Sequence, residues 1–600
     1  MSTTTTIPQR QDVPAGDRWD LGSLFAREED WEQALQVYQE SIPRISEFEG
    51  TLGDSAENLA NWIEFSTELE RKAERLAYYA HLRVSEDLGS SAAQDRFARF
   101  MQAATKAEAA AGFQAPEIQA IPDERMQEYL LHERIAPYAI ALKKLLRLKP
   151  HVLSAAEERL LAMQQEANQT SSKVFGALTD VDMKFGEVDT PEGTRELSQS
   201  AYGSFMLHPE RRVREDAHTK FYSEFADHKN ALASLYAGSI QLDIYKARVR
   251  NYPSAREAAL FVDDVPVTVY DSLIDAVTEA LPQLHRYYAL RRRVLGVDKL
   301  RLYDTKVPLV SELTVRHSYE QAVEQVVGAV APLGNEYVEP LRVGLLGAWV
   351  DRYENKGKRS GAFSAGSYDG YPYILMNYKE DVLGDVFTLA HEAGHSMHSY
   401  FSARANPFQH YDYTIFEAEV ASTFNEQLLF DKMRREAEDD NLRLYLVNKQ
   451  IDDILGTLIR QTMFAEFEKR THEIVENGGA VTLDVFRSEY RKLLEKYFGP
   501  DVELLANDDL EGLRVPHFYR AFYVYKYATG ISAAIALSGR VLRGESGALE
   551  DYQAFLRSGG SRYPIESLRI AGVDMTKPEP VREALRLFGK LVGELESGLQ

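Results

Sequence analysis

One short run of the sequence has residue types and spacing that could hold a metal ion beside a general base. Residues 389–398 read LAHEAGHSMH, which contains His-Glu-x-x-His in a stretch predicted to be helical. Residues four positions apart share a helix face, so His391 and His395 can turn two imidazoles towards one ion. Glu392 can reach a water on that ion without binding the metal itself. With zinc, which lowers the pKa of a bound water to about 7, this arrangement is typical of a metallopeptidase.

The residues around the motif favour a functional helix over a surface helix that carries two histidines by chance. A buried imidazole or carboxylate needs a partner, and a metal ion supplies one. Gly394 costs a helix about 1 kcal/mol relative to alanine, which indicates close packing by another element. His398 lies seven residues after His391, too far along the axis to join the same ion, and is interpreted as a supporting or core histidine. The helix should be buried because it carries a set of apolar side chains: Val382, Leu383, Val386, Phe387 and Ala390.

A third protein ligand for the ion is expected on the next helical segment, residues 414–426. This segment carries three acids, Glu417, Glu419 and Glu426. At about 100° per residue, Glu419 and Glu426 fall on nearly the same face, whereas Glu417 lies about 160° from Glu419. Glu417 and Glu419 are therefore not expected to bind one ion together. The spacing alone does not choose between these two.

The motif and the segment after it resemble a known family. His391 to His398, followed by Phe416 to Glu426, is similar to the oligoendopeptidase F family, whose members are relatives of thimet oligopeptidase. The resemblance extends over about residues 19–590. It implies a mostly α fold: an elongated, two-lobed helical metallopeptidase with a deep central channel and a small β-sheet next to the zinc helix. Such a channel would admit unfolded peptides and exclude folded proteins.

The resemblance also implies a ligand set. In the wider group, the third ligand is a glutamate before a small-residue step, and another glutamate follows seven residues later. Glu419, then residues 420–422, then Glu426 fit that pattern. The resemblance thus implies one Zn²⁺ ion per chain, held by His391, His395 and Glu419. It leaves Glu426 as an acid that orients a ligand histidine.

An aromatic stretch from His517 to Gly530 carries further candidates. Composition alone favours packing in the core, but phenol and imidazole groups can also donate hydrogen bonds to the oxyanion that develops during peptide hydrolysis. In thimet-like enzymes, a histidine followed by tyrosines in this part of the chain has that role. The similarly spaced Tyr527 belongs to the same set, whose members cannot all face one direction, so the tyrosine that faces the metal stays open. The resemblance implies these catalytic candidates: His517, Tyr519, Tyr523 and Tyr525.

Composition limits the partners of the chain. Its 600 residues are 44% hydrophobic and carry a net charge of −23, and there is no cysteine. The negative net charge argues against a nucleic-acid partner, because phosphate binding needs a basic surface. The absence of cysteine excludes disulfides and thiolate metal ligands. We see neither a secretory signal nor a run of 18 apolar residues, so no membrane partner is expected and the cytoplasm is the default location.

The residue patterns along the chain and the family resemblance predict four regions. Residues 1–18 are expected to be disordered, 19–115 to form an N-terminal helical region, 116–200 a domain of the oligoendopeptidase F N-terminal type, and 201–590 the catalytic zinc domain. Val181 to Val188 suggests a short strand. The β-prone residues 373–378 predict a small sheet just before the zinc helix. This sheet is either a supporting hairpin or an edge that pairs with an extended peptide.

Together these patterns predict a zinc-dependent oligoendopeptidase that cleaves internal bonds of short unfolded peptides, with Glu392 as the base. A zinc exopeptidase of related fold, either a carboxypeptidase or a dipeptidyl carboxypeptidase, is one alternative. A non-catalytic helical protein that binds peptides is the other. The sequence does not indicate an oligomeric state.

Overall fold

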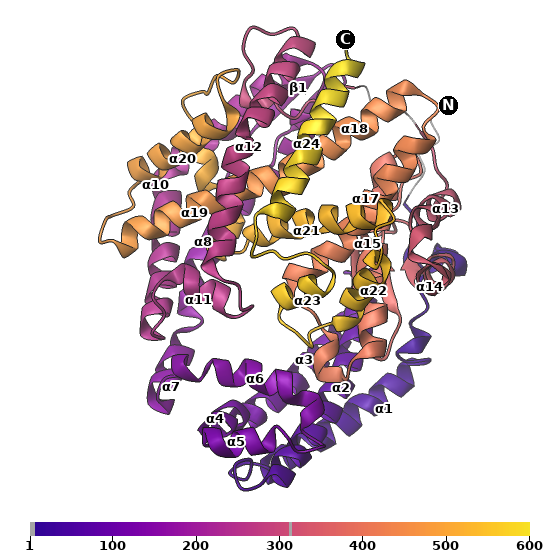
Figure 1. Ribbon diagram of the computed structural model, residues 1–600, viewed down its shortest axis with the longest axis vertical. Coiled ribbons are helices and arrows are strands. Elements are labelled where there is room, and N and C mark those ends of the chain that lie inside the picture. Colours follow the sequence, from indigo (N-terminus) through magenta and orange to yellow (C-terminus); the bar gives the residue numbers. More distant parts are fainter. Residues whose placement is uncertain (1–6, 311–314) are drawn as a thin grey trace. The chain divides into compact units, whose positions relative to one another are not determined.

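The computed structural model describes residues 7–310 and 315–600, and it confirms a mostly helical fold with small sheets (Figure 1). The chain forms two compact units. Unit 1 comprises Met1–Pro150, Thr314–Lys432 and Leu537–Val573, and unit 2 comprises His151–Leu313, Met433–Ala536 and Asp574–Gln600. Each unit contains segments from distant parts of the sequence, and the predicted boundaries at residues 115 and 200 stay a prediction. The predicted two-lobed shape and deep channel depend on how these units are placed relative to each other, and both stay predictions.

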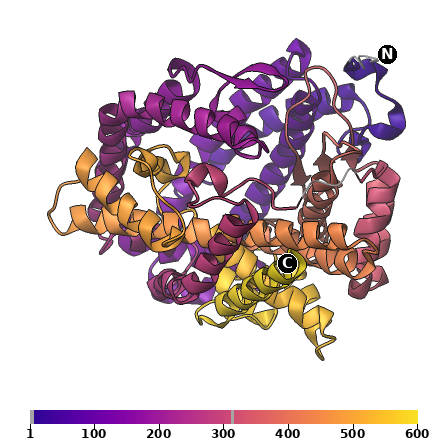
Figure 2. The same cartoon turned by 90° about the horizontal axis from the view of Figure 1, so that it is seen from above.

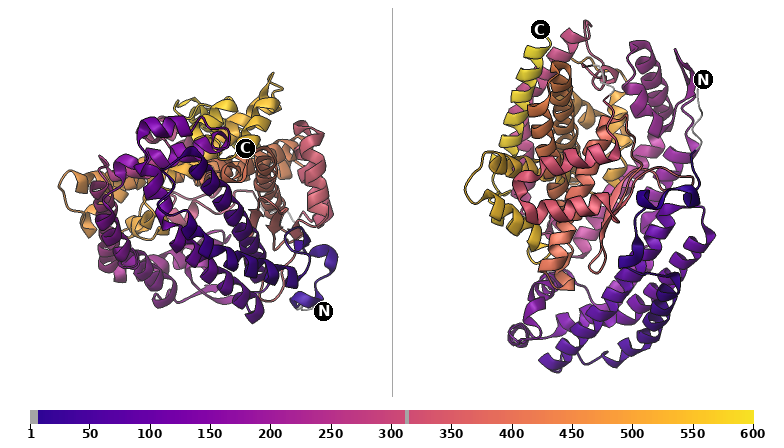
Figure 3. Two further views of the ribbon diagram at one scale, coloured as in Figure 1. Left: turned by 90° about the horizontal axis from the view of Figure 1, so that it is seen from below. Right: turned by 90° about the vertical axis from the view of Figure 1, so that its right-hand side faces the viewer.

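The first part of unit 1 is a group of helices around a large apolar core. The long helices α2 and α3 lie side by side (Figure 3). Each begins at a serine that accepts a hydrogen bond from a backbone N–H of the first turn: Ser55 from Asn58 and Ser90 from Ala93. Such caps satisfy donors that the helix itself leaves free. The helices of this part are α1 (Glu28–Ser41), α2 (Ala56–Glu86), α3 (Ser91–Ala110), α4 (Gln114–Ala120), α5 (Asp123–Tyr129) and α6 (Ala139–Arg147).

The prediction of disorder for residues 1–18 is wrong for residues 7–18, which the structure describes; residues 1–6 lie outside the described residues. This segment forms two short 3-10 turns, Arg10–Asp12 and Ala15–Asp17. Arg10 pairs with Glu86 at 3.1 Å and with Asp351, which is fully buried. A buried carboxylate needs such a partner. The order comes from an ion pair between residues 341 positions apart, which local composition does not reveal.

The rest of unit 1 contains the predicted small sheet. Its strands are β3 (Val350–Asp351), β4 (Phe363–Gly366) and β5 (Pro372–Leu375), in the order β3-β5-β4. Strand β5 is buried and pairs in parallel with β3 and antiparallel with β4. Strand β4 is half-buried and forms one edge.

Helix α15, which carries the motif, packs against β4, β5 and α22, and strands and helices of this part lie together in Figure 2. This arrangement confirms the predicted sheet next to the motif helix. The helices of this part are α13 (Tyr319–Ala329), α14 (Asn335–Leu346), α15 (Leu383–Ala405), α16 (Phe408–Tyr411), α17 (Ile415–Glu436), α22 (Ala548–Ser558) and α23 (Pro564–Ile570).

Unit 2 is built on long helices, and α24 packs along both α12 and α18 (Figure 1). Its helices are α7 (Ala155–Gln164), α8 (Thr170–Ala177), α9 (Gln199–Met206), α10 (Arg211–Val249), α11 (Ala255–Phe261), α12 (Val267–Val294), α18 (Asp440–Ile454), α19 (Arg460–Glu476), α20 (Leu483–Phe498) and α24 (Glu579–Gly598). Helix α21 (Tyr525–Leu542) begins in unit 2 and ends in unit 1.

The strand predicted for residues 181–188 is only partly present. Residues Leu178–Asp182 form a π-helical turn, and strand β1 begins at Glu187. It runs from Glu187 to Thr190 and pairs antiparallel with β2 (Gly193–Glu196).

In the part of the chain that the structure describes, no helix has the length and apolar character that crossing a bilayer requires. The cytoplasmic location stays a prediction.

Candidate metal centre

Helices α15 and α17 of unit 1 bring three possible ligands together. His391 and His395 lie one turn apart on α15, and Glu419 lies on α17. Nε2 of His391 is 3.2 Å from Nε2 of His395 and 3.6 Å from Oε2 of Glu419. One ligand atom of each residue lies within 4.8 Å of the others. Among residues 7–310 and 315–600, these three form the only such group of histidine and acidic side chains.

These distances fit a tetrahedral zinc ion. With Zn–N bonds of about 2.0–2.1 Å, two histidine nitrogens on one tetrahedral ion lie about 3.3 Å apart. The two imidazole nitrogens of this chain approach that separation. The donor set of two nitrogens and one carboxylate oxygen is that of many catalytic zinc sites, which keep a fourth position for water.

The close approach of α15 and α17 depends on a glycine. A Cβ atom on Gly394 would lie 2.5 Å from both the backbone oxygen of Ala421 and the Cα atom of Ser422. Real side chains do not tolerate such contacts with backbone. Asn425 of α17 also donates a hydrogen bond to the backbone oxygen of Ala390, at 3.3 Å. The close packing that Gly394 predicts is therefore present, and α17 is the element that requires it.

Glu426 holds the imidazole of His391. Its carboxylate accepts a hydrogen bond from Nδ1 of His391. With the proton on Nδ1, Nε2 carries the lone pair that a metal needs. Burial would lower the pKa of His391, but the hydrogen bond and charge of Glu426, with the charges of Glu392 and Glu419, outweigh burial and raise the pKa to about 9.

Glu392 lies beside the ligand group and is nearly buried. Burial raises its pKa to about 7; the charge of His391 opposes the shift, and the charges of Glu419 and Glu426 add to it. A carboxylate with a pKa near neutrality can both accept and return a proton.

Glu417 and His398 point elsewhere. Glu417 is fully buried, where its carboxylate accepts hydrogen bonds from the backbone and hydroxyl of Thr414. His398 is fully buried and stacks on Tyr413, with ring centroids 3.6 Å apart. Burial lowers the pKa of His398 to about 3. Glu419, and not Glu417, is thus the acid whose carboxylate lies beside the two histidines of the motif. The spacing within the segment had left this choice open.

The ligand group opens into a pocket of about 470 Å³ within unit 1. Strand β4 forms one wall of the pocket. It packs so closely on α15 that a side chain on Gly366 would collide with Ser399. Tyr78 of α2 and the segment 411–413 form other parts of the wall. Glu392, both histidines and Glu419 all line this pocket. The pocket can therefore admit a substrate to the ligand group.

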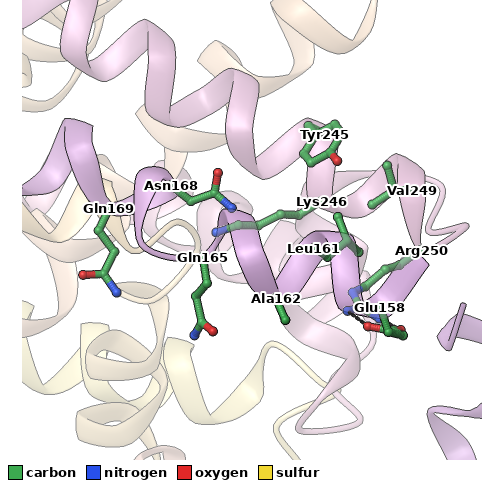
Figure 4. Close-up of a pocket in the computed structure, with 10 residues that line it drawn as sticks. All are labelled: Glu158, Leu161, Ala162, Gln165, Asn168, Gln169, Tyr245, Lys246, Val249 and Arg250. Carbon is green, nitrogen blue, oxygen red and sulfur yellow. Dashed lines mark hydrogen bonds and ion pairs between the residues drawn. The ribbon is translucent and has the colours of Figure 1, made fainter. Parts of the chain in front are cut away.

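A second pocket, of about 460 Å³, lies in unit 2 between α7 and the end of α10 (Figure 4). Its acid, Glu158, is already paired with Arg250 through two contacts of 2.8 Å. Amide side chains such as Gln165 and Asn168 and the exposed Tyr245 make up much of the remaining wall. This pocket has none of the chemistry of the first one.

The aromatic candidates lie in unit 2, and the structure divides them. The ring of His517 is 6.3 Å from that of Tyr523 and 6.0 Å from that of Tyr527, and the two tyrosine rings are 5.5 Å apart. Tyr525 is fully buried against Tyr270. We call His517, Tyr523 and Tyr527 the aromatic cluster.

Tyr519 does not belong to the aromatic cluster. It packs between Phe175 and Tyr236, and its hydroxyl is buried without a hydrogen-bond partner in the part of the chain that the structure describes. Tyr519 is half-buried and Tyr525 is buried, and their role as catalytic donors stays a prediction. The ring of Tyr527, which the sequence analysis did not include among its catalytic candidates, lies beside that of Tyr523. Helical spacing could not have shown this, because Tyr523 precedes α21, which begins at Tyr525.

Comparisons with known proteins agree with this geometry. Residues 204–587 match the family described as Peptidase family M3, and residues 117–185 match Oligopeptidase F. Oligopeptidase PepF of Bacillus subtilis is 40% identical over 98% of this chain and 88% of its own length. An oligoendopeptidase F homolog of Borreliella burgdorferi is 38% identical over 98% of this chain and 100% of its own length. The chain belongs to peptidase family M3.

Solved structures share the fold of this family M3 chain. A crystal structure from Chlamydophila abortus has a TM-score of 0.93 and 33% identity, and covers 99% of this chain and 100% of its own. The oligoendopeptidase F of Enterococcus faecium has a TM-score of 0.74 and 34% identity, and the match covers 95% of this chain and 99% of its own. Family membership makes the chain a metalloendopeptidase that hydrolyses peptides, which confirms the enzyme class predicted from its motif.

Proposed function

We propose that this chain is a zinc-dependent oligoendopeptidase that hydrolyses internal bonds of short unfolded peptides. One zinc ion per chain is held by His391, His395 and Glu419. The observation that carries the proposal is the pair of Nε2 atoms facing each other at 3.2 Å in an open pocket, with the Glu419 carboxylate beside them. Family membership supports the same reaction class.

The protein groups around the ligands have separate tasks. When bound, zinc supplies an acidified water and polarises the scissile carbonyl. Glu392 takes a proton from the attacking water and passes it to the leaving amine, and its raised pKa suits transfer near neutral pH. Glu426 keeps the proton of His391 on Nδ1 and so keeps Nε2 available as a ligand.

Strand β4 provides a means to hold an extended peptide. It pairs with β5 on one side only, and three of its residues line the pocket. An extended segment can add to such an edge through backbone hydrogen bonds. This mode of binding recognises backbone rather than side chains and requires an unfolded segment. It supports oligopeptides as substrates.

The aromatic cluster supplies the donors for the oxyanion in this proposal. The family resemblance implies this role for His517, Tyr519, Tyr523 and Tyr525. Of these, His517 and Tyr523 have their rings close together, and Tyr527 joins them because its ring lies beside both. A phenol or imidazole donor aimed at the developing charge stabilises the transition state more than the ground state.

Digestion of a peptide of about ten residues, with both ends blocked, tests the proposal. Mass spectrometry of the products should show internal cleavage that a chelator abolishes and added zinc restores. An exopeptidase would leave the blocked peptide intact but shorten its free counterpart from one end. A peptide-binding protein without activity would bind both peptides and cleave neither. Either result would overturn the proposed endopeptidase.

A further inference from the structure

Phe522 has a backbone conformation that needs an explanation. Its φ is +57°, in the left-handed region where a side chain costs about 1–2 kcal/mol. Strain of this kind persists only where the surroundings hold it, and it concentrates at functional sites. The side chain is 2% exposed, and its ring lies 4.6 Å from the ring of His472. The strained residue separates the segment that carries His517 from Tyr523.

A buried acid on α19 holds this strained residue. Oε1 of Glu468 accepts a hydrogen bond of 2.9 Å from the backbone N–H of Phe522. Glu468 is fully buried, and Oε2 has no hydrogen-bond partner among residues 7–310 and 315–600. Burial raises the pKa of Glu468 far above its usual range; the bond from Phe522 opposes this shift and the charge of Asp243 adds to it.

The groups around Glu468 do not compensate for its burial. His472, one turn later, donates its Nδ1 proton to the backbone oxygen of Glu468 and not to the carboxylate. Nε2 of His472 lies 3.6 Å from Oδ2 of Asp243 and has no hydrogen bond in the described part of the chain. The raised pKa favours the neutral acid, and Oε1 is its one carboxyl oxygen with a hydrogen bond in the described part of the chain. The contact that this carboxyl group makes is therefore the one to the turn at Phe522.

The turn at Phe522 determines how two donors are presented. Tyr523 follows it directly, and its ring is nearly parallel to that of His517, with an angle of 13° between the planes. The guanidinium of Arg520 lies 4.1 Å above the Tyr523 ring. A change in the φ of Phe522 would rotate Tyr523 away from His517, because no residue lies between the strained one and the donor.

We propose that Glu468 is a positioning residue that fixes the turn at Phe522 and thereby keeps His517 and Tyr523 side by side for catalysis. It acts through the hydrogen bond to the Phe522 N–H and does not touch the substrate. The inference rests on the proposed role of the aromatic cluster.

A matched pair of variants tests this role. Glu468→Leu keeps the size of the side chain but removes the acceptor, and we expect kcat to fall about 10- to 100-fold, as for a small misplacement of a catalytic group. KM should change little, because His517 and Tyr523 act mainly in the transition state. Glu468→Gln retains an acceptor oxygen and should keep kcat within about threefold, since one neutral acceptor replaces another.

Glu466→Ala is the control. Glu466 lies two residues earlier on α19, is also buried, and accepts hydrogen bonds from Lys496, Arg470 and Tyr497. Its loss should lower thermal stability without changing kcat. Hydrogen exchange of the peptide covering residues 517–527, measured without substrate, should accelerate in Glu468→Leu but not in Glu466→Ala. Equal exchange of this peptide in the two variants would overturn the proposal.

A double-mutant cycle shows whether Glu468 acts through Tyr523. Tyr523→Phe removes one donor, and Glu468→Leu in that background should cause little further loss of kcat. Independent, additive losses would overturn the proposal. An unchanged kcat in Tyr523→Phe alone would overturn the proposed donor role and this inference with it. A loss in Tyr523→Phe but not in Glu468→Leu would overturn only the role of Glu468.

Discussion

Glu426 of α17 accepts the Nδ1 proton of His391 on α15, and Nε2 of the same imidazole faces Nε2 of His395 at 3.2 Å. One carboxylate thus determines both the tautomer and the direction of an imidazole that belongs to another helix, and that imidazole is a proposed metal ligand. Residues that orient metal ligands in this way affect metal affinity without binding the ion.

Removing the charge of Glu426 should weaken metal binding. At a pH above 9, where His391 is already neutral before the ion binds, we expect Glu426→Gln to reduce zinc affinity about 10- to 100-fold, the usual effect of losing a partner of a ligand histidine. Competition with a chromogenic chelator measures this affinity. Glu417→Gln is the control, because Glu417 lies on the same helix but bonds to Thr414. A similar loss in both variants would show that general damage to α17 is responsible.

Zinc binding should depend on pH through His391. Its neighbouring acids raise the pKa of this imidazole to about 9, so His391 carries a proton below that pH before an ion binds. A ligand must be neutral, so the apparent affinity should fall about tenfold for each pH unit below 9. Burial keeps the pKa of His395 far below its usual range, so His395 adds nothing in this window.

Calorimetry in buffers of different ionisation enthalpy measures the protons released by this binding. Between pH 7.5 and 8.5 we expect His391 to release most of one proton per ion, in addition to the proton that the metal-bound water loses. Glu426→Gln should reduce the total release, because it lowers the pKa of His391. Equal proton release by the two proteins in this window would contradict the assigned state of His391.

The third ligand can be tested by metal content. Glu419→Ala should lose most of its bound zinc, because a tetrahedral site with two protein ligands is far weaker. Glu417→Ala should keep its metal, although it leaves a cavity and reduces stability by about 2 kcal/mol or more. Elemental analysis after dialysis decides between them. Zinc retained by the first variant and lost by the second would reverse the assignment.

The sequence predicted most of this centre because its signals are local. His391, Glu392 and His395 lie within five residues, so helix geometry alone places two imidazoles on one face. The helical fold and the small sheet followed from periodicity and β-propensity. Glu419 needed the family resemblance, since its partners lie on another helix and the spacing within α17 did not distinguish it from Glu417.

The failures of the sequence analysis involve contacts between distant residues or unusual backbone. Arg10 is held by Asp351 and Glu86, which lie far away in the sequence. The composition of residues 1–18 therefore could not show that the segment around Arg10 is ordered. The aromatic stretch contains a turn at Phe522 with positive φ, which no helical or strand pattern anticipates. This turn separates Tyr519, which packs between Phe175 and Tyr236, from Tyr523, in the aromatic cluster.

Loss of the base should separate binding from chemistry. Glu392→Gln should retain zinc, because Glu392 is not among the three ligands, and should reduce kcat by about 10²- to 10⁴-fold. Zinc content and turnover of one preparation give both quantities. Hydrolysis close to that of the unchanged enzyme, at full zinc content, would exclude Glu392 as the base.

Gly394 makes the distance between two helices a determinant of metal binding. The atoms that a Cβ would meet are backbone atoms of α17, Ala421 and Ser422, and neither can rotate away. Helix α17 would therefore have to shift as a whole. Glu419 lies on α17, so the shift would also change its distance from His391, now 3.6 Å between Oε2 and Nε2.

Gly394→Ala should therefore lose both stability and metal affinity. Overpacking costs about 1–3 kcal/mol, more than the gain of about 1 kcal/mol in helix propensity, so the free energy of unfolding should fall. Gly384→Ala, on the same helix, is the control: its Cβ would meet only a Val382 side-chain atom at 3.7 Å. Thermal unfolding and zinc titration of both variants measure the two effects. If Gly394→Ala bound zinc as tightly as Gly384→Ala, the separation of α15 and α17 would not control the site.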